Sequence, residues 1–412
     1  MISVTEVFPT IEQTIVNRNH ILKSLWNPNL DLFGFTVKIK AGSLHQKKAL
    51  AATTTIQLLL EGTHRYNSAQ IAEQIDFYGG HTEISAEKDF VSLTIYVAKR
   101  NFRTILPLIF EILTEPSFSE EELMRFKEKK KKQLGLNLEK ISWLAKTAFL
   151  TALYPNHPYG ETLTFEMIES LTAADLKAHH AAFYTAENMR FFLFGNYDAA
   201  DIATVKSIFS ALPSGVPAQS LHAKPEIFTA PAFLGQSKPN ALQAALRVGT
   251  KMPNITHEDF PSLMIYNTLL GGYFGSRLMQ NIREEKGLTY SIYSALVSLQ
   301  DSGYFYIDTE IAPHAVELTL SEISKEIIEL QTAPISEDAC LGLRNYLSGQ
   351  ALRQIDGTYA VFKKLIFYDD YGLDFEVEKK YFDAIHTFTP KDIMETARKY
   401  TTLESVKVVV KP

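Results

Sequence analysis

The chain has 412 residues, of which 46% are hydrophobic and 21% are charged, and these ordinary values exclude a disordered or collagen-like protein. At about 150 residues per domain, the length predicts two or three domains. The 41 Lys and Arg residues against 47 Asp and Glu give a formal net charge of -6. This net charge gives no electrostatic reason to expect binding to nucleic acid or to an anionic membrane. A single cysteine, Cys340, excludes an internal disulfide framework and a thiolate metal cluster. We expect it to be a small buried apolar residue.

The start of the sequence carries no recognisable targeting signal. Residues 1–9 lack a basic first segment and a long apolar stretch, unlike a secretory signal peptide. Apolar runs elsewhere, such as 105–110 and 191–194, are far shorter than the roughly 18 residues of a membrane-spanning helix. We therefore expect a cytoplasmic protein with no membrane partner.

The predicted elements, in chain order, are typical of an α+β protein. Polar and apolar residues alternate at 35–40 and 90–97 in the first half and at 303–308 in the second, which predicts strands. Helical periodicity covers four segments in each half: 49–60, 68–78, 102–113, 119–152, 260–270, 276–285, 312–330 and 336–355. We expect one sheet with helices on one face, twice over.

An internal repeat closes each half of the chain. A helix that begins at Thr172 is followed by a strand at 189–194, and a helix that begins at Thr389 is followed by a strand at 405–410. Each Thr is the expected N-cap, and an Asp three residues later completes a capping pattern. The repeat indicates a duplicated domain.

The composition between the two halves predicts a linker. The first domain is expected to cover residues 1–211 and the second residues 240–412. The segment 212–239 between them is rich in proline, alanine and glycine, as linkers often are.

The eleven histidines form no zinc-binding pattern. None of them stands in H-x-x-x-H, H-E-x-x-H or H-x-x-E-H spacing, which would place two imidazoles on one helical face. His179 and His180 are adjacent, so on a helix they point about 100° apart, and we expect them at an exposed helical position. The basic run 127–132 is expected to be a solvated helix face, and the glycine-rich segment 270–275 a tight turn.

A charged helix end is followed by a strand after Gly287, with Arg283 and Tyr290 on either side of the turn. A guanidinium offers several fixed donors and a phenol can donate or accept, so this pair could bind a peptide backbone. The alternative is a structural role, in which Arg283 pairs with Glu284 or the helix end and Tyr290 is a half-buried strand residue.

The segment 269–293, LLGGYFGSRLMQNIREEKGLTYSIY, closely resembles the second-domain signature of the insulinase-like (pitrilysin) zinc peptidases. This family includes the subunits of the mitochondrial processing peptidase. Residues 60–63, 77–80, 152–160 and the closing unit of each half match the family in the same order, over nearly the whole chain. The resemblance implies an α+β fold of two homologous domains, each an antiparallel β-sheet backed by helices.

The chain departs from this family at the zinc motif. Active members carry H-x-x-E-H in the helix before a Gly-Thr pair, and the corresponding positions here are Thr53, Ile56 and Gln57. The third ligand, a downstream Glu, would fall within 127–139, where Gln133 is the nearest match. These replacements remove the Lewis acid and the proton acceptor together. We expect no metal on this chain and no peptide hydrolysis by it alone.

The resemblance also implies what the chain retains. In active members an Arg and a Tyr spaced like Arg283 and Tyr290 contact the substrate, and some members divide the work between a zinc-bearing subunit and a degenerate one. This chain would then be the non-catalytic subunit of a heteromeric peptidase and would close the substrate chamber. Arg283 would orient the substrate backbone, and Tyr290 would stabilise charge on the scissile carbonyl oxygen.

The implied partners follow from that role. One is a catalytic subunit with an intact H-x-x-E-H motif, which would hold the zinc in a dimer with this chain. The other is an unfolded peptide, bound in extended form at a sheet edge. No nucleic-acid partner is expected.

Two other functions stay open. A peptide-binding or assembly protein without a proteolytic role would use the same cavity but would not need the Arg/Tyr pair. A self-sufficient metallopeptidase would need unorthodox ligands such as His45, His64 or His81 with Glu83, whose spacings fit no known zinc helix. The zinc content of the purified chain would discriminate this second alternative.

Overall fold

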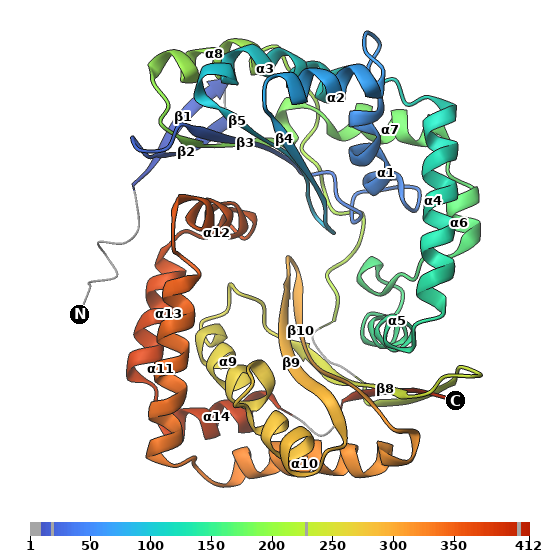
Figure 1. Ribbon diagram of the computed structural model, residues 1–412, viewed down its shortest axis with the longest axis vertical. Helices are drawn as coiled ribbons and strands as arrows, with labels where there is room; N and C mark the ends of the chain where they lie inside the picture. The colour runs from blue at the N-terminus through green and yellow to red at the C-terminus, as the bar shows by residue number, and fades with distance from the viewer. Residues whose placement is uncertain (1–9, 18–19, 227–229, 402–404) are drawn as a thin grey trace.

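The computed structural model describes residues 10–17, 20–226, 230–401 and 405–412, which form two halves, each built on one β-sheet (Figure 1). The first sheet has the strand order β1-β2-β6-β3-β5-β4 and the second the order β7-β11-β8-β10-β9. The strands are β1 (Ile11–Asn17), β2 (His20–Trp26), β3 (Leu32–Ile39), β4 (His81–Ala86), β5 (Val91–Ala98), β6 (Met189–Gly195), β7 (Ala232–Ser237), β8 (Ala244–Met252), β9 (Thr289–Leu299), β10 (Ser302–Ile311) and β11 (Val406–Lys411).

Helices surround both sheets. In the first half they are α1 (Ala51–Leu58), α2 (Ser68–Phe77), α3 (Lys99–Thr114), α4 (Glu120–Leu138), α5 (Ile141–Leu153), α6 (Phe165–Glu169), α7 (Ala173–Phe183) and α8 (Ala199–Phe209). In the second they are α9 (Phe260–Asn267), α10 (Val316–Thr332), α11 (Glu337–Arg353), α12 (Thr358–Asp370), α13 (Glu376–Thr387) and α14 (Pro390–Tyr400). Among the described residues, no helix combines the length and the apolar character needed to cross a bilayer.

The duplicated α+β architecture is confirmed by the pairing of the two closing strands. β6 lies between β2 and β3, parallel to the first and antiparallel to the second. β11 lies between β7 and β8 with the same two orientations. Each sheet is therefore mixed, with one parallel pair, rather than wholly antiparallel. The parallel pair is allowed because each closing strand enters its sheet after a helix and not through a hairpin.

The helices before both closing strands begin as predicted. At the start of α7, the Thr172 Oγ1 accepts a hydrogen bond from the Asp175 amide at 3.2 Å, and the Asp175 carboxylate accepts one from the Thr172 amide at 2.9 Å. Thr389 and Asp392 form the same capping box at the start of α14, with distances of 3.3 and 2.8 Å. Local capping chemistry thus positions both closing strands.

One predicted helix, 119–152, is in fact two. α4 ends at Leu138, and α5 begins after Lys140, whose backbone is extended. No glycine or proline marks this break, so helical periodicity alone could not show it. The change of direction carries α5 away from α4 and onto the second sheet (Figure 1).

Each half covers part of the other half's sheet. Helix α5, from the first half, packs on β8 and β11, and its Phe149 ring centroid lies 6.1 Å from that of Tyr304 on β10. Helix α12, from the second half, packs on β6, where the Phe362 and Phe194 ring centroids are 4.6 Å apart. The segment 212–239, predicted as a linker, contains β7.

Candidate functional site

The three positions of the expected zinc motif lie on α1. Ile56 is completely buried in the core of the first half, Thr53 is half-buried and Gln57 is exposed. The fourth position, Gln133, is exposed on α4 and donates a hydrogen bond of 3.1 Å to the side chain of Asn137. A hydroxyl and two amides with a buried isoleucine lack the imidazole, thiolate and carboxylate groups that bind zinc in proteins. The donor set on α1 and α4 therefore does not fit zinc.

The alternative ligands considered above lie in different surroundings. His45 is buried and donates a hydrogen bond of 3.0 Å through Nδ1 to a main-chain carbonyl. His64 and His81 are exposed, and Glu83 accepts a hydrogen bond of 2.8 Å from Lys363. Over the described ranges, no three His, Cys, Asp or Glu side chains converge in a way that could hold a metal ion.

On α7, His179 is buried and His180 is half-buried, so the prediction of an exposed position is wrong. His179 Nε2 lies 3.0 Å from the carbonyl oxygen of Ala41, and His180 Nε2 lies 2.8 Å from that of Leu113. Helix α7 packs against α1. Burial lowers the pKa of His179 to about 4 and also lowers the pKa of His180. Both residues link α7 to neighbouring main chain.

Arg283 and Tyr290 meet on either side of a tight turn. Arg283 belongs to the π-helical segment η6 (Met279–Glu285), Tyr290 to β9, and Gly287 between them has a φ of 62°, which favours glycine. The Arg283 Nε donates a hydrogen bond of 2.8 Å to the main-chain oxygen of Tyr290. Arg283 also pairs with Glu284, which is the contact that the structural alternative predicts for this residue.

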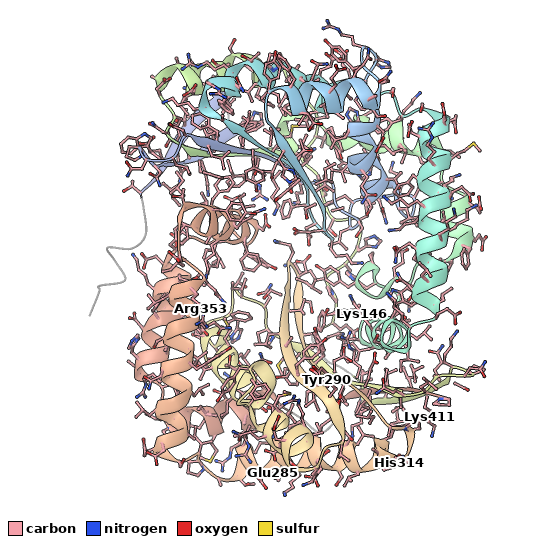
Figure 2. The ribbon with its side chains drawn as sticks, viewed as in Figure 1. Lys146, Glu285, Tyr290, His314, Arg353 and Lys411 are labelled. Atoms are coloured by element: carbon pink, nitrogen blue, oxygen red, sulfur yellow. The ribbon has the colours of Figure 1, made fainter. Side chains whose placement is uncertain are left out.

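The side chain of Tyr290 is 87% exposed, so the alternative of a half-buried strand residue is wrong for this position (Figure 2). The guanidinium carbon of Arg283 lies 5.7 Å from the Tyr290 ring centroid and 5.0 Å from that of Phe274. Such contacts between a cation and an aromatic ring are attractive. They hold the guanidinium beside an accessible phenol.

The contact of Phe274 with the guanidinium of Arg283 could not be predicted from the sequence. Phe274 stands in the glycine-rich segment 270–275, whose prediction as a tight turn is only partly right. Residues 270–272 belong to the π-helical segment η5 (Thr268–Gly272), and the chain turns after it, where the Ser276 amide donates to the Tyr273 oxygen at 3.1 Å. Phe274 is 66% exposed. The sequence shows only a Tyr-Phe pair between Gly272 and Gly275, and the contact of Phe274 with Arg283 depends on how η6 packs against the turn.

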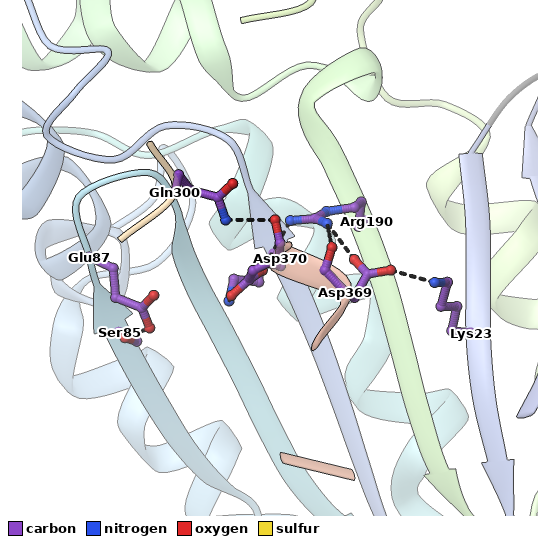
Figure 3. Close-up of polar contacts among 8 residues, drawn as sticks. Lys23, Ser85, Glu87, Arg190, Gln300, Asp369 and Asp370 are labelled. Carbon is purple, nitrogen blue, oxygen red and sulfur yellow. Dashed lines mark hydrogen bonds and ion pairs between the residues drawn. The ribbon is translucent and has the colours of Figure 1, made fainter. Parts of the chain in front are cut away.

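A charged cluster, also not predicted, joins the two halves (Figure 3). Asp369 and Asp370 end α12, and their partners Lys23, Lys38 and Arg190 come from β2, β3 and β6 of the first sheet. Lys23 Nζ lies 2.5 Å from the Asp369 carboxylate, and an Arg190 nitrogen lies 3.1 Å from that of Asp370. The sequence shows two adjacent aspartates and scattered bases, but not which of them pair.

Two known protein families match parts of this chain. The family described as insulinase (peptidase family M16) matches residues 27–165, and the one described as peptidase M16 inactive domain matches residues 170–347. The chain belongs to the insulinase-like M16 peptidase family. The recognition based on segment 269–293 is confirmed.

Solved structures share the fold of this M16 chain. A peptidase M16 inactive domain from Pseudomonas fluorescens superposes with a TM-score of 0.90 at 22% identity, covering 98% of both chains. A protease from Helicobacter pylori also gives a TM-score of 0.90, at 18% identity over 98% of this chain and 100% of that one.

Curated relatives are similar over most of the chain. An uncharacterized zinc protease of Bacillus subtilis is 24% identical over 336 residues, which cover 81% of each protein. One from Mycobacterium leprae is 26% identical over 300 residues, or 71% of this chain and 66% of the relative.

Proposed function

We propose that this chain is the non-catalytic subunit of a heteromeric M16 zinc peptidase. It would close the substrate chamber and present Arg283 and Tyr290 to the active site of a partner that carries H-x-x-E-H. The observation that carries this proposal is the combination of an accessible, mutually held Arg/Tyr pair with a donor set on α1 that does not fit zinc.

The chemistry of the pair suits a substrate backbone. The guanidinium of Arg283 still has donors beyond the Nε that binds Tyr290, and these could bind a carbonyl group of an extended peptide. The phenol of Tyr290 could donate a hydrogen bond to a carbonyl oxygen as negative charge develops there. Preorganised donors of this kind are among the larger catalytic contributions.

The decisive experiment is reconstitution. The chain would be mixed with an M16 chain that has an intact H-x-x-E-H motif, and hydrolysis of a fluorogenic unfolded peptide would be followed. We expect hydrolysis well above that of either chain alone. Tyr290→Phe should lower kcat of the complex by about 100-fold, the size of effect seen when one oxyanion donor is removed. Arg283→Ala should mainly raise KM.

Two matched variants provide controls. Tyr359→Phe and Arg353→Ala change exposed residues on α12 and α11 and should leave kcat and KM unchanged. If the complex hydrolyses no faster than the zinc-bearing chain alone, or if the Arg283 and Tyr290 variants match these controls, the proposal is wrong.

Zinc content tests the self-sufficient peptidase directly. Zinc per chain would be measured on protein purified without added metal or chelator, and we expect a value near zero. About one tightly held zinc per chain would contradict the proposal, because it would require a complete ligand set on this chain.

A further inference from the structure

The turn between β4 and β5 and the turn between β9 and β10 meet at a polar cavity between the two halves. In Figure 1 the β9–β10 hairpin points toward the end of β4 in the first half. Asp89 and Phe90 from the first turn and Gln300 and Asp301 from the second line one cavity of about 570 Å³. Apart from Phe90, the described residues that line it are polar or charged. Charge therefore decides how well the two turns fit together.

Three aspartates line this cavity, and two of them have a counter-charge. An Arg190 nitrogen lies 3.1 Å from the carboxylate of Asp370 at the end of α12. Lys224 Nζ lies 3.1 Å from the carboxylate of Asp301. In the part of the chain that the structure describes, neither a hydrogen bond nor an ion pair involves the carboxylate of Asp89. Asp89 is thus the member of this group whose negative charge is least compensated.

The charge of Asp89 is unfavourable when the two turns are together. Asp89 is half-buried, and the carboxylates of Asp301 and Asp370 approach it from the second half. The exposed Lys40 attracts it only in part. Burial, and after it the charge of Asp301, raises the pKa of Asp89 from its ordinary value to about 7. Both causes weaken if the turns separate, because water and distance then screen the carboxylate.

Other charged and titratable groups surround Asp89 on every side. Those that line the cavity, besides the two aspartates of the second half, are Lys40, His45, Glu187, Arg190, His222 and Lys224. Glu87, Lys88, Tyr159 and Tyr371 also lie close to it. Burial raises the pKa of both tyrosines, which therefore stay neutral. Burial lowers the pKa of His45, so this ring takes up a proton only below about pH 6.5.

From this arrangement we infer that Asp89 is a proton-sensitive latch between the two halves. Its neutral form lets the β4–β5 and β9–β10 turns dock, and its ionised form drives them apart. The docked state binds a proton that the separated state releases, so docking is favoured as the pH falls. For one such group, the docking equilibrium constant should fall by about tenfold between pH 6 and pH 8.

The latch is independent of the Arg/Tyr pair, and only its consequence for a substrate rests on the proposed function. If the substrate chamber lies between the two halves, a lower pH favours its closed form. The experiments below use this chain alone, without a partner or a substrate. Their failure would overturn the latch and leave the proposed function standing, and failure of the reconstitution would leave the latch standing.

Infrared spectroscopy tests the proton on Asp89 directly. A protonated carboxyl group has a carbonyl stretching band that an ionised one lacks, so a titration between pH 6 and pH 8 should show this band disappear with a midpoint near pH 7. Asp89→Asn should remove this component. Asp301→Asn should move its midpoint to lower pH, because it removes a like charge. Asp76→Asn, at an exposed position on α2, is the control and should keep the component unchanged.

A cysteine in the β9–β10 hairpin tests the movement. The Ser302 Oγ lies 3.0 Å from the Tyr154 hydroxyl oxygen in the first half, so a thiol from Ser302→Cys should react faster with a maleimide when the hairpin leaves this contact. The buried Cys340 would be replaced by serine. The labelling rate is divided by that of the same chain with Asp89→Asn at the same pH, which cancels the ionisation of the thiol and of His45. This ratio should rise by about tenfold from pH 6 to pH 8.

Each measurement can overturn the inference. It is wrong if the infrared component survives in Asp89→Asn, or if Asp76→Asn removes it as well. It is also wrong if Asp301→Asn leaves the midpoint unchanged, because the repulsion would then not come from the second half. A labelling ratio that is the same at pH 6 and pH 8 would show that the proton on Asp89 does not control docking.

Discussion

Arg190 on β6 donates a hydrogen bond of 2.8 Å to the main-chain oxygen of Asp369 at the end of α12, and its guanidinium also contacts the Asp369 carboxylate (Figure 3). These residues belong to different halves of the chain. The neighbouring Asp370 extends the junction further, because its main-chain oxygen accepts a hydrogen bond of 2.6 Å from Gln300 in the β9–β10 hairpin. The ends of α12, β6 and this hairpin are thus held together, which sets how the two sheets face each other.

The buried pair at this junction should be costly to break. Lys38 and Asp370 contact each other with side chains only 5% and 6% exposed. Asp370→Asn would leave the Lys38 ammonium buried without its counter-charge, so we expect the free energy of unfolding to fall by about 3 kcal/mol. Urea denaturation at pH 7 measures this. Glu395→Gln, which breaks an exposed pair with Lys391, should cost about 0.5 kcal/mol or less. Equal effects would show that the junction pair is unimportant.

Position 56 on α1 should not accept a carboxylate. Because Ile56 is completely buried in an apolar core, Ile56→Glu removes apolar contacts and buries an acid without a partner. We expect a loss of at least about 3 kcal/mol in the free energy of unfolding. Gln57→His, at the exposed neighbouring position, should change it by about 0.5 kcal/mol or less. A fully stable Ile56→Glu variant would contradict this picture of α1.

His179 should make stability depend on pH. Burial lowers its native pKa to about 4, below the roughly 6.5 of an unfolded chain. Neutral His179 therefore costs the folded state nothing above about pH 6.5. As the pH falls from there toward 4, the unfolded chain takes up a proton that the folded chain does not, and the free energy of unfolding falls. When the pH is lowered from 7.5 to 5, the free energy of unfolding should fall in the parent chain and in His179→Gln. The fall should be about 2 kcal/mol smaller in His179→Gln, which lacks this titrating group. Urea denaturation at both pH values tests this, with exposed His64→Gln as a control that should retain the parent behaviour.

The capping box at the start of α14, before the last strand, should contribute measurably to the stability of the fold. Thr389→Ala removes the side-chain acceptor at the start of α14, and replacing such an N-cap costs about 1 kcal/mol. The lysine at position 391 is in the same first turn with its side chain 75% exposed, so Lys391→Ala should be nearly neutral. Thermal denaturation followed by circular dichroism would compare the two variants. Equal melting temperatures would contradict the prediction.

Features that depend on near neighbours could be predicted from the sequence alone. The capping boxes at Thr172 and Thr389 involve atoms three residues apart, and the turn at Gly287 needs only a residue that tolerates positive φ. The duplication is visible because the same capped helix and strand close each half of the chain. The family membership is visible because short local motifs follow one another in the family's order.

The tertiary structure alone decided which groups are buried and which groups meet. His179 is inside because α7 packs against segments distant in the chain, where the His179 ring meets the main chain of Ala41. The long predicted helix is broken where α5 turns to cover the second sheet. The pairing of Arg190 with Asp369 brings together residues far apart in the chain. Local periodicity carries no information on such contacts, because they are set by the packing of whole elements against one another.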